Sequence, residues 1–194
     1  MRPSTRYVTA PAMFILTLVL GGTAYGAATR PAAPVPAPEW EVSEWLNGDP
    51  GSLEDNRGRV VLIEFFQLWC PGCTRFSRPL FRRWDRLYGE RDDIRLVSIH
   101  SVFEGHGHQT VTRLRDYLAD HQLTHSVGID AYGPDDDETP LTMKRYRTRG
   151  TPQVVIVDKQ GRLRWTRFGG FDPAAAERVI DQLLAEPGPE AGPK

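Results

Sequence analysis

The sequence predicts an α/β fold in which a central mixed β-sheet is flanked by helices on both faces. Residues 60–66 form a continuous apolar run of strand length, which is typical of a strand buried on both faces. Segments with strand and helix patterns then alternate along the chain. The last three segments have the pattern of two strands joined by a short turn and followed by a helix, so the sheet is expected to contain parallel and antiparallel neighbours.

The first strand, residues 60–66, is followed by a helical pattern over residues 73–88. Pro79 lies inside this pattern, and a proline within a helix removes one hydrogen bond and bends the axis. We therefore expect a kink at Pro79. The apolar positions that predict the buried face of this helix are Phe76, Leu80, Trp84 and Leu87.

The middle of the chain continues the alternation. Residues 94–99 are predicted to form a strand, residues 110–121 a helix, residues 126–129 a short strand and residues 141–146 a short helix. The second of these elements has Val111, Leu114, Tyr117 and Leu118 on one face.

The C-terminal part has the pattern of a hairpin and a closing helix. Residues 154–157 and 163–168 are predicted strands, and the turn at residues 158–161 joins them. Asp172 suits the N-cap of the last helix because its side chain can accept a hydrogen bond from the first turn. Pro173 suits the first helical position.

Cys70 and Cys73 are the only two cysteines in the chain. Two cysteines in this spacing at the start of a helix lie within disulfide reach of each other. The positive end of the helix favours a thiolate at the first position, and that thiolate can attack a foreign disulfide. A structural disulfide across so short a loop would add little stability, and a structural zinc site needs about four ligands. The pair therefore indicates redox catalysis.

The N-terminus has the order of a secretory signal. Arg2 and Arg6 precede an apolar run at residues 12–22, and small residues follow as far as residue 28. We interpret residues 1–28 as a signal peptide, with an uncleaved N-terminal anchor as the alternative. No cysteine follows the apolar run, so the sequence does not predict a lipoprotein anchor.

The rest of the chain divides into three parts. Residues 29–38 are rich in Pro and Ala and are expected to form an extended linker. Residues 39–186 are expected to form the folded domain, and the Pro- and Gly-containing residues 187–194 a disordered tail. The formal net charge of −1 gives no reason to expect a nucleic-acid partner.

The order of these motifs resembles the thioredoxin-like fold. A buried strand leads into Trp69 and the Cys70–Cys73 pair, and Gly150-Thr151-Pro152 precedes the hairpin. The export signal and the lead-in at residues 52–59 are similar to the TlpA/ResA-type branch of exported thiol-disulfide oxidoreductases. The resemblance covers residues 52–184. It implies that Cys70 is the attacking thiol and that Cys73 resolves the mixed disulfide.

The resemblance also assigns the proline before the hairpin. It implies that the Thr151–Pro152 bond is cis and that Pro152 faces the cysteine pair. A chain turned in this way would present the backbone of Thr151 to an extended client peptide. The alternative is a trans proline that merely begins a strand.

Glu64 is the only charged residue in the first strand. A carboxylate there is costly unless it is paired or protonated. Its position before the cysteine pair matches that of the buried aspartate of thioredoxins, which assists proton transfer from the resolving cysteine. The TlpA/ResA-type branch commonly has a neutral side chain at this position. Glu64 is therefore a candidate proton acceptor for Cys73, and a carboxylate turned toward a surface arginine is the alternative.

The residues within and before the cysteine pair are expected to tune it. Pro71-Gly72 reverses the order found in thioredoxin, and the intervening residues affect thiolate stability and redox poise. Trp69 is expected to shield the sulfur atoms and contact the client, with ordinary packing as the alternative.

The histidines form no convincing metal motif. His106 and His108 flank a glycine, but such a pair is more often solvated than metal-binding. The acidic run at residues 135–138 lacks the spacing of a calcium loop. We predict no metal site and no cofactor other than the Cys70–Cys73 disulfide.

We therefore predict an exported, periplasmic thiol-disulfide oxidoreductase, with reduction of cytochrome or metalloprotein precursors as a possible task. A copper-delivery protein of the same fold is one alternative, although such proteins space their cysteines more widely. A peroxiredoxin-type peroxidase is another, but Gln67 stands where it needs Thr or Ser. The expected partners are protein thiol or disulfide clients and a membrane-bound thiol donor, and the expected state is a monomer.

Overall fold

The computed structural model describes residues 35–134 and 138–189. The predicted signal at residues 1–28, the first part of the linker and the last five residues of the tail lie outside this part of the chain. Asp135, Asp136 and Asp137 of the acidic run also lie outside it. No helix of the described residues is long and apolar enough to span a membrane.

The described residues form a mixed sheet of seven strands in the order β1-β7-β6-β3-β4-β5-β2. β3 lies at its centre, parallel to β4 and antiparallel to β6. β4 and β5 are also parallel, and the remaining neighbours are antiparallel. The strands are β1 (Val35–Pro36), β2 (Val42–Leu46), β3 (Val60–Phe66), β4 (Ile94–His100), β5 (Ser126–Asp130), β6 (Gln153–Val157) and β7 (Arg162–Phe168).

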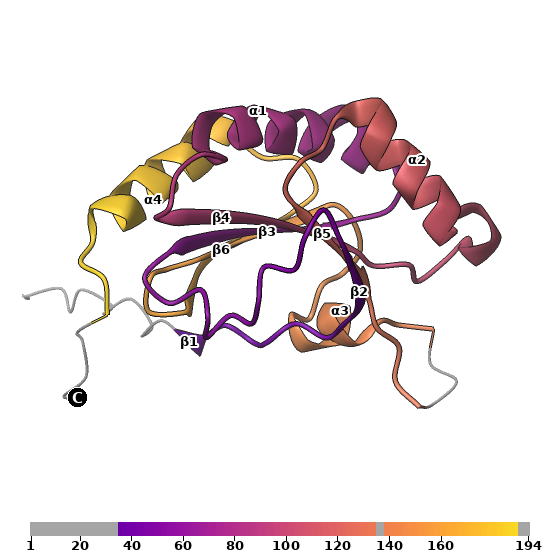
Figure 1. Ribbon diagram of the computed structural model, residues 1–194, viewed down its shortest axis with the longest axis horizontal. Helices are drawn as coiled ribbons and strands as arrows, with labels where there is room; N and C mark the ends of the chain where they lie inside the picture. The colour runs from indigo at the N-terminus through magenta and orange to yellow at the C-terminus, as the bar shows by residue number, and fades with distance from the viewer. Residues whose placement is uncertain (1–34, 135–137, 190–194) are drawn as a thin grey trace, which may run out of the picture. The chain divides into compact units, whose positions relative to one another are not determined.

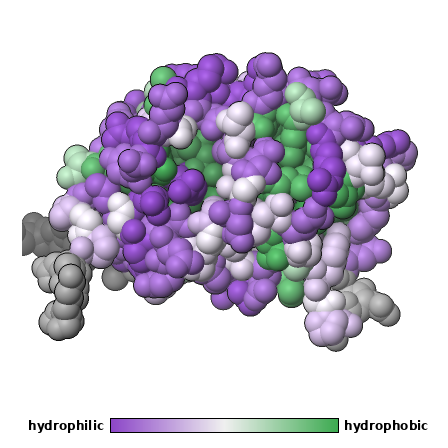
Figure 2. All heavy atoms as spheres, viewed as in Figure 1, coloured by the Kyte–Doolittle hydropathy of each residue, from purple (hydrophilic) through white to green (hydrophobic). Residues whose placement is uncertain are grey.

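Helices cover both faces of this sheet, as the sequence predicts. α1, α2 and α4 lie on one face and α3 lies on the other (Figure 1). The helices are α1 (Arg78–Tyr88), α2 (Val111–His121), α3 (Leu141–Arg145) and α4 (Pro173–Ala185). Asp172 caps α4 as expected, because its side chain accepts the N–H of Ala174 at 3.0 Å. On the side shown in Figure 2 most residues are hydrophilic, and hydrophobic ones are visible mainly where the helices cover the sheet.

Alternate residues of β3 enter two different cores. Val60 and Leu62 pack with α1 and α4, whereas Val61, Ile63 and Phe65 pack on the α3 side. By this alternation Glu64 points toward the face that α1 covers. The register of the parallel pair places Ser98 of β4 directly opposite it.

The helix after the cysteine pair ends at Tyr88 as predicted, but its first turn and the burial of Leu87 differ from the prediction. Residues Cys73–Ser77 form a wider π-helical turn in which the N–H of Arg78 bonds to the carbonyl of Cys73. The helical path runs without a break from this turn through Ser77 into α1, so the irregularity lies directly before Pro79 and not at it. The prediction that Leu87 is buried is wrong: its side chain is 53% exposed, and Tyr88 packs against the core instead.

Two N-terminal strands were not predicted. β1 lies inside the expected linker and pairs with β7, so the sheet begins ahead of the Glu39 boundary. β2 pairs with β5 at the opposite edge of the sheet. Both are edge strands that depend on partners far along the chain.

Candidate active site

The two cysteines lie where β3 leads into the π-helical turn. Both are free thiols, so the structure shows the reduced pair. Cys73 is fully buried, whereas Cys70 is partly exposed. Only the first thiol can therefore meet a client disulfide without a rearrangement.

The loop before β6 closes over the cysteine pair. The Thr151–Pro152 bond is cis, as predicted. The thiol of Cys70 donates a hydrogen bond of 3.2 Å to the carbonyl oxygen of Thr151, and the N–H of Cys73 donates to the Cys70 sulfur at 3.4 Å. These contacts bring Cys70, Cys73, Thr151 and Pro152 together.

Gly72 fits against this loop because it has no side chain. A Cβ atom at this position would lie 2.7 Å from Cδ of Pro152 and 3.8 Å from the Cys70 sulfur. The backbone of Gly72 is ordinary right-handed helix, so space and not the φ angle requires glycine here. Gly72, which the sequence predicts to tune the redox pair, thus also sets how closely Pro152 approaches the two cysteines.

Cys70 opens into a groove of about 280 Å³, which we call the Cys70 groove. Two large side chains on its walls are about half exposed, Trp69 at 54% and Phe168 at 52%. The groove is lined by Gln67, Trp69, Cys70, Pro71, Phe103, Glu104, Gly150, Thr151 and Phe168.

Sequence analysis missed Phe103 and Phe168 as groove residues. Phe168 lies here because the register of the hairpin places it opposite Gln153, next to Pro152. Phe103 follows β4 near the end of the sheet that carries the cysteines. The sequence signal that could have identified Phe168 is its place as an aromatic residue at the end of the predicted hairpin strand.

Glu64 is buried beneath the cysteine pair, with a side chain only 4% exposed. Its Oε2 accepts a hydrogen bond of 2.9 Å from the hydroxyl of Ser98, and its Oε1 has no hydrogen-bond partner. Burial raises the pKa of Glu64 above its usual range, although the hydroxyls of Ser77 and Ser98 oppose the rise. The alternative of a carboxylate turned toward a surface arginine is wrong.

Cys73 shares this buried environment. Burial raises the pKa of the Cys73 thiol, and the negative charge of Glu64 raises it further. Cys73 is therefore held as a thiol in the reduced protein. It needs a proton acceptor before it can attack the mixed disulfide, and Glu64 is the nearby candidate.

Comparison with known proteins agrees with this geometry. A family model described as a thioredoxin-like domain matches residues 53–184. The chain belongs to the thioredoxin-like family. It is 33% identical to a solved thiol-disulfide isomerase from Corynebacterium glutamicum, with a TM-score of 0.74 over 79% of this chain and 98% of that one.

Two curated relatives extend the comparison. The thiol-disulfide oxidoreductase YkuV of Bacillus subtilis is 22% identical over 142 residues, which are 73% of this chain and 88% of YkuV. Protein DipZ of Mycobacterium tuberculosis is 26% identical over 155 residues, which are 76% of this chain but only 20% of DipZ. The chain thus spans about a fifth of the length of DipZ. These relationships confirm a thiol-disulfide oxidoreductase of the thioredoxin-like family and its resemblance to the TlpA/ResA type.

The close contact between Gly72 and Pro152 predicts how a substitution at Gly72 changes stability and disulfide exchange. Gly72→Ala is expected to lower stability by about 1–3 kcal/mol, because the rigid proline ring must move to admit the methyl group. The same displacement should weaken the Thr151–Cys70 contact and slow exchange with a small disulfide. Urea unfolding and stopped-flow exchange measure the two effects.

Gly107→Ala is the control, because a Cβ there has no neighbour within 4 Å. Unchanged stability and exchange in Gly72→Ala would contradict this role.

The histidines are divided between the core and the surface. His100 is buried, where burial lowers its pKa to about 4, and it contacts Gln109 at 3.2 Å. His125 is also buried, whereas His106 and His108 are exposed. Among residues 35–134 and 138–189 no three His, Cys, Asp or Glu side chains are grouped as a metal site would require.

Proposed function

We propose that this oxidoreductase works outside the cytoplasm and reduces disulfides in protein clients. The proposal rests mainly on one observation, the partly exposed Cys70 sulfur in an apolar groove above a buried Cys73. Trp69 and Phe168 are suited to hold apolar client side chains on either side of the reacting disulfide. The Thr151 backbone beside Cys70 suits an extended client.

The reaction would proceed in two exchanges. The Cys70 thiolate attacks a client disulfide, one client sulfur leaves as a thiolate, and a mixed disulfide forms. Cys73 then gives its proton to the Glu64 carboxylate and attacks the Cys70 sulfur. The second client thiolate leaves, and the Cys70–Cys73 disulfide is formed. The client disulfide is reduced, the two cysteines are oxidised, and no other redox group takes part.

The composition of the groove favours the reductase direction. Every residue that lines the Cys70 groove lies in the described part of the chain, and none is Lys, Arg or His. The Cys70 sulfur instead faces the carbonyl oxygen of Thr151, and Glu104 lies on the groove wall. A cation would stabilise the reduced form and make the pair a stronger oxidant.

Export is supported by the charged and apolar pattern of residues 1–28. A reductase in an oxidising compartment must be reduced again after each cycle, so we also propose a membrane-bound thiol donor. Clients would be proteins whose cysteines must be reduced, for example before cytochrome or metal insertion.

Measurement of the reduction potential of the Cys70–Cys73 pair tests the direction. Equilibration with glutathione buffers, followed by alkylation and mass spectrometry, is expected to give a potential nearer to that of thioredoxin, about −270 mV, than to that of DsbA, about −120 mV. A potential near that of DsbA, about −120 mV, would contradict the reductase proposal. Fractionation of cells that produce the full chain tests export separately.

A further inference from the structure

A line of buried polar side chains leads away from Glu64. The hydroxyl of Ser98 lies 2.9 Å from Oε2 of Glu64 and 2.8 Å from Nε2 of His125. Ser98 is 1% exposed and His125 is 8% exposed, so the packed interior surrounds both contacts. The three side chains come from β3, β4 and the segment just before β5.

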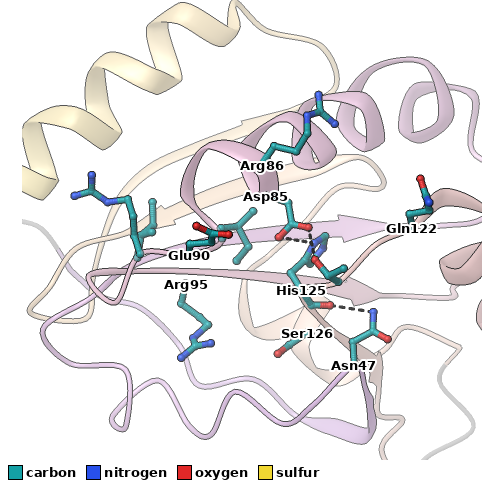
Figure 3. Close-up of a pocket in the computed structure, with 13 residues that line it drawn as sticks. Asn47, Asp85, Arg86, Glu90, Arg95, Gln122, His125 and Ser126 are labelled. Atoms are coloured by element: carbon teal, nitrogen blue, oxygen red, sulfur yellow. Dashed lines mark hydrogen bonds and ion pairs between the residues drawn. The ribbon is translucent and has the colours of Figure 1, made fainter.

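The other nitrogen of His125 faces an exit from the interior. Nδ1 lies 3.8 Å from Oδ1 of Asp85 on α1, longer than a hydrogen bond but within ion-pair range. Oδ2 of Asp85 accepts a hydrogen bond of 2.6 Å from Thr124. Figure 3 shows Asp85 and His125 facing each other in a pocket of about 720 Å³, which both residues line.

We propose that Ser98, His125 and Asp85 form a proton relay between Glu64 and this pocket. The relay rests on the proposed role of Glu64 as proton acceptor for Cys73. Ser98 and His125 do not touch the reacting sulfur atoms, so they are positioning residues that act through Glu64. The pocket is separate from the Cys70 groove, and the two have no lining residue in common. The proton could then leave without crossing a groove that the client occupies.

Hydrogen-bond geometry allows two arrangements of the relay. A hydroxyl carries one proton, so Ser98 cannot donate to Glu64 and His125 at the same time. When Glu64 is ionised, Ser98 donates to it and Nε2–H of His125 donates to Ser98. When Glu64 is protonated, it donates to Ser98, and Ser98 donates to a bare Nε2 while Nδ1–H faces Asp85.

These arrangements give the proton that Cys73 releases during resolution a path to water in the pocket. Cys73 loses a proton to Glu64, and its sulfur forms the bond to Cys70 as the client thiolate leaves. Glu64 passes a proton to Ser98, which passes its own to Nε2 of His125. The resulting imidazolium is stabilised by the Asp85 carboxylate and loses its Nδ1 proton to water in the pocket. Glu64 is then a carboxylate again, and His125 is left as the Nε2–H tautomer of the first arrangement. The imidazole returns to the Nδ1–H tautomer by proton exchange with water in the pocket before the next transfer.

Other groups around the relay influence its charge. The positive charge of Arg78 lowers the pKa of Glu64 against the effect of burial, and a positive charge on His125 acts in the same direction during the transfer. The interaction with His125 and, after it, the hydrogen bond from Thr124 lower the pKa of Asp85 against the effect of burial, which keeps this carboxyl group ionised. The charged and titratable groups near Glu64 are Cys73, Arg78 and Tyr117, and those that line the pocket beside His125 and Asp85 are Arg86, Glu90, Arg91 and Arg95.

Single-turnover kinetics of the full chain with a disulfide-containing protein tests the relay. Ser98→Ala and His125→Gln are each expected to slow release of the mixed disulfide about tenfold or more at neutral pH. This is less than the roughly 10²–10⁴-fold that a directly positioned acid or base contributes, because both residues act through Glu64. The rate of attack by Cys70 should not change. Ser101→Ala is the matched control, because Ser101 is equally buried at the end of β4 but donates to Asp130.

Chemical rescue separates proton transfer from a structural role. His125→Ala leaves space beside the pocket, and added imidazole is expected to restore fast release. Pyrazole has the same ring size but is a far weaker base, so it should not restore release. Equal rescue by both rings, or release at the wild-type rate in Ser98→Ala and His125→Gln, would overturn the relay. If the wild-type protein showed no attack through Cys70, the proposed function itself would fail.

Discussion

Cys73→Ser is expected to convert the protein into a trap for its clients. Cys70 remains partly exposed in its groove and can still attack, but the only resolving thiol is gone. A mixed disulfide between Cys70 and the client should therefore accumulate to near completion, whereas the wild-type protein shows it only transiently. Non-reducing gels and mass spectrometry of alkylated samples measure the adduct.

Cys70→Ser is the matched variant and is expected to abolish exchange. Cys73 is fully buried and its raised thiol pKa disfavours the nucleophilic form, so it cannot replace Cys70. The variant should form no client adduct and should react slowly with alkylating reagents while folded. An adduct on Cys73 in this variant, or faster alkylation of Cys73 than of Cys70 in the wild-type protein, would reverse the assigned roles.

The central elements of the fold could be predicted because local pattern determines them. The apolar run of β3 and the hairpin of β6 and β7 are visible in neighbouring residues. β1 and β2 could not be predicted in this way. They are short edge strands whose partners, β7 and β5, lie far along the chain. The π-helical turn before Pro79 also depends on how the chain packs above β3.

The site residues also divide into those that a local sequence pattern identifies and those that only the folded chain brings together. Cys70, Cys73 and Pro152 belong to short motifs, and Glu64 is conspicuous as a charge in an apolar strand. Ser98 and His125 carry no such signal, because a serine in a strand and a histidine near one are ordinary. Their connection to Glu64 depends on the parallel register of β3 and β4 and on the close approach of β5. Sequence analysis could find the chemistry at the cysteine pair but not the polar contacts beneath it.

Glu64→Gln is expected to stabilise the reduced protein increasingly as the pH rises. The pKa of Glu64 is raised in the folded state above the ordinary value of 4.5, so the folded protein holds this proton more tightly than the unfolded chain. The free energy of unfolding of the wild-type protein therefore decreases as the pH rises from 4.5 through the higher pKa that Glu64 has in the folded state. Glutamine can still accept the Ser98 hydrogen bond and carries no charge. Each unit of raised pKa corresponds to about 1.4 kcal/mol of advantage for the variant.

Urea unfolding of the reduced wild-type and Glu64→Gln proteins at about pH 4 and about pH 8 measures this difference. The lowered pKa of His100 also makes stability depend on pH, but it affects both proteins alike and cancels at each pH. The same substitution should slow release of the mixed disulfide, because Cys73 loses its proton acceptor. If Glu64→Gln is more stable than the wild-type protein at the higher pH but releases the mixed disulfide more slowly, Glu64 is retained for its chemistry at a cost in stability. An equal stability difference at both pH values, together with unchanged release, would show that Glu64 is neither a raised-pKa carboxyl group nor a proton acceptor for Cys73.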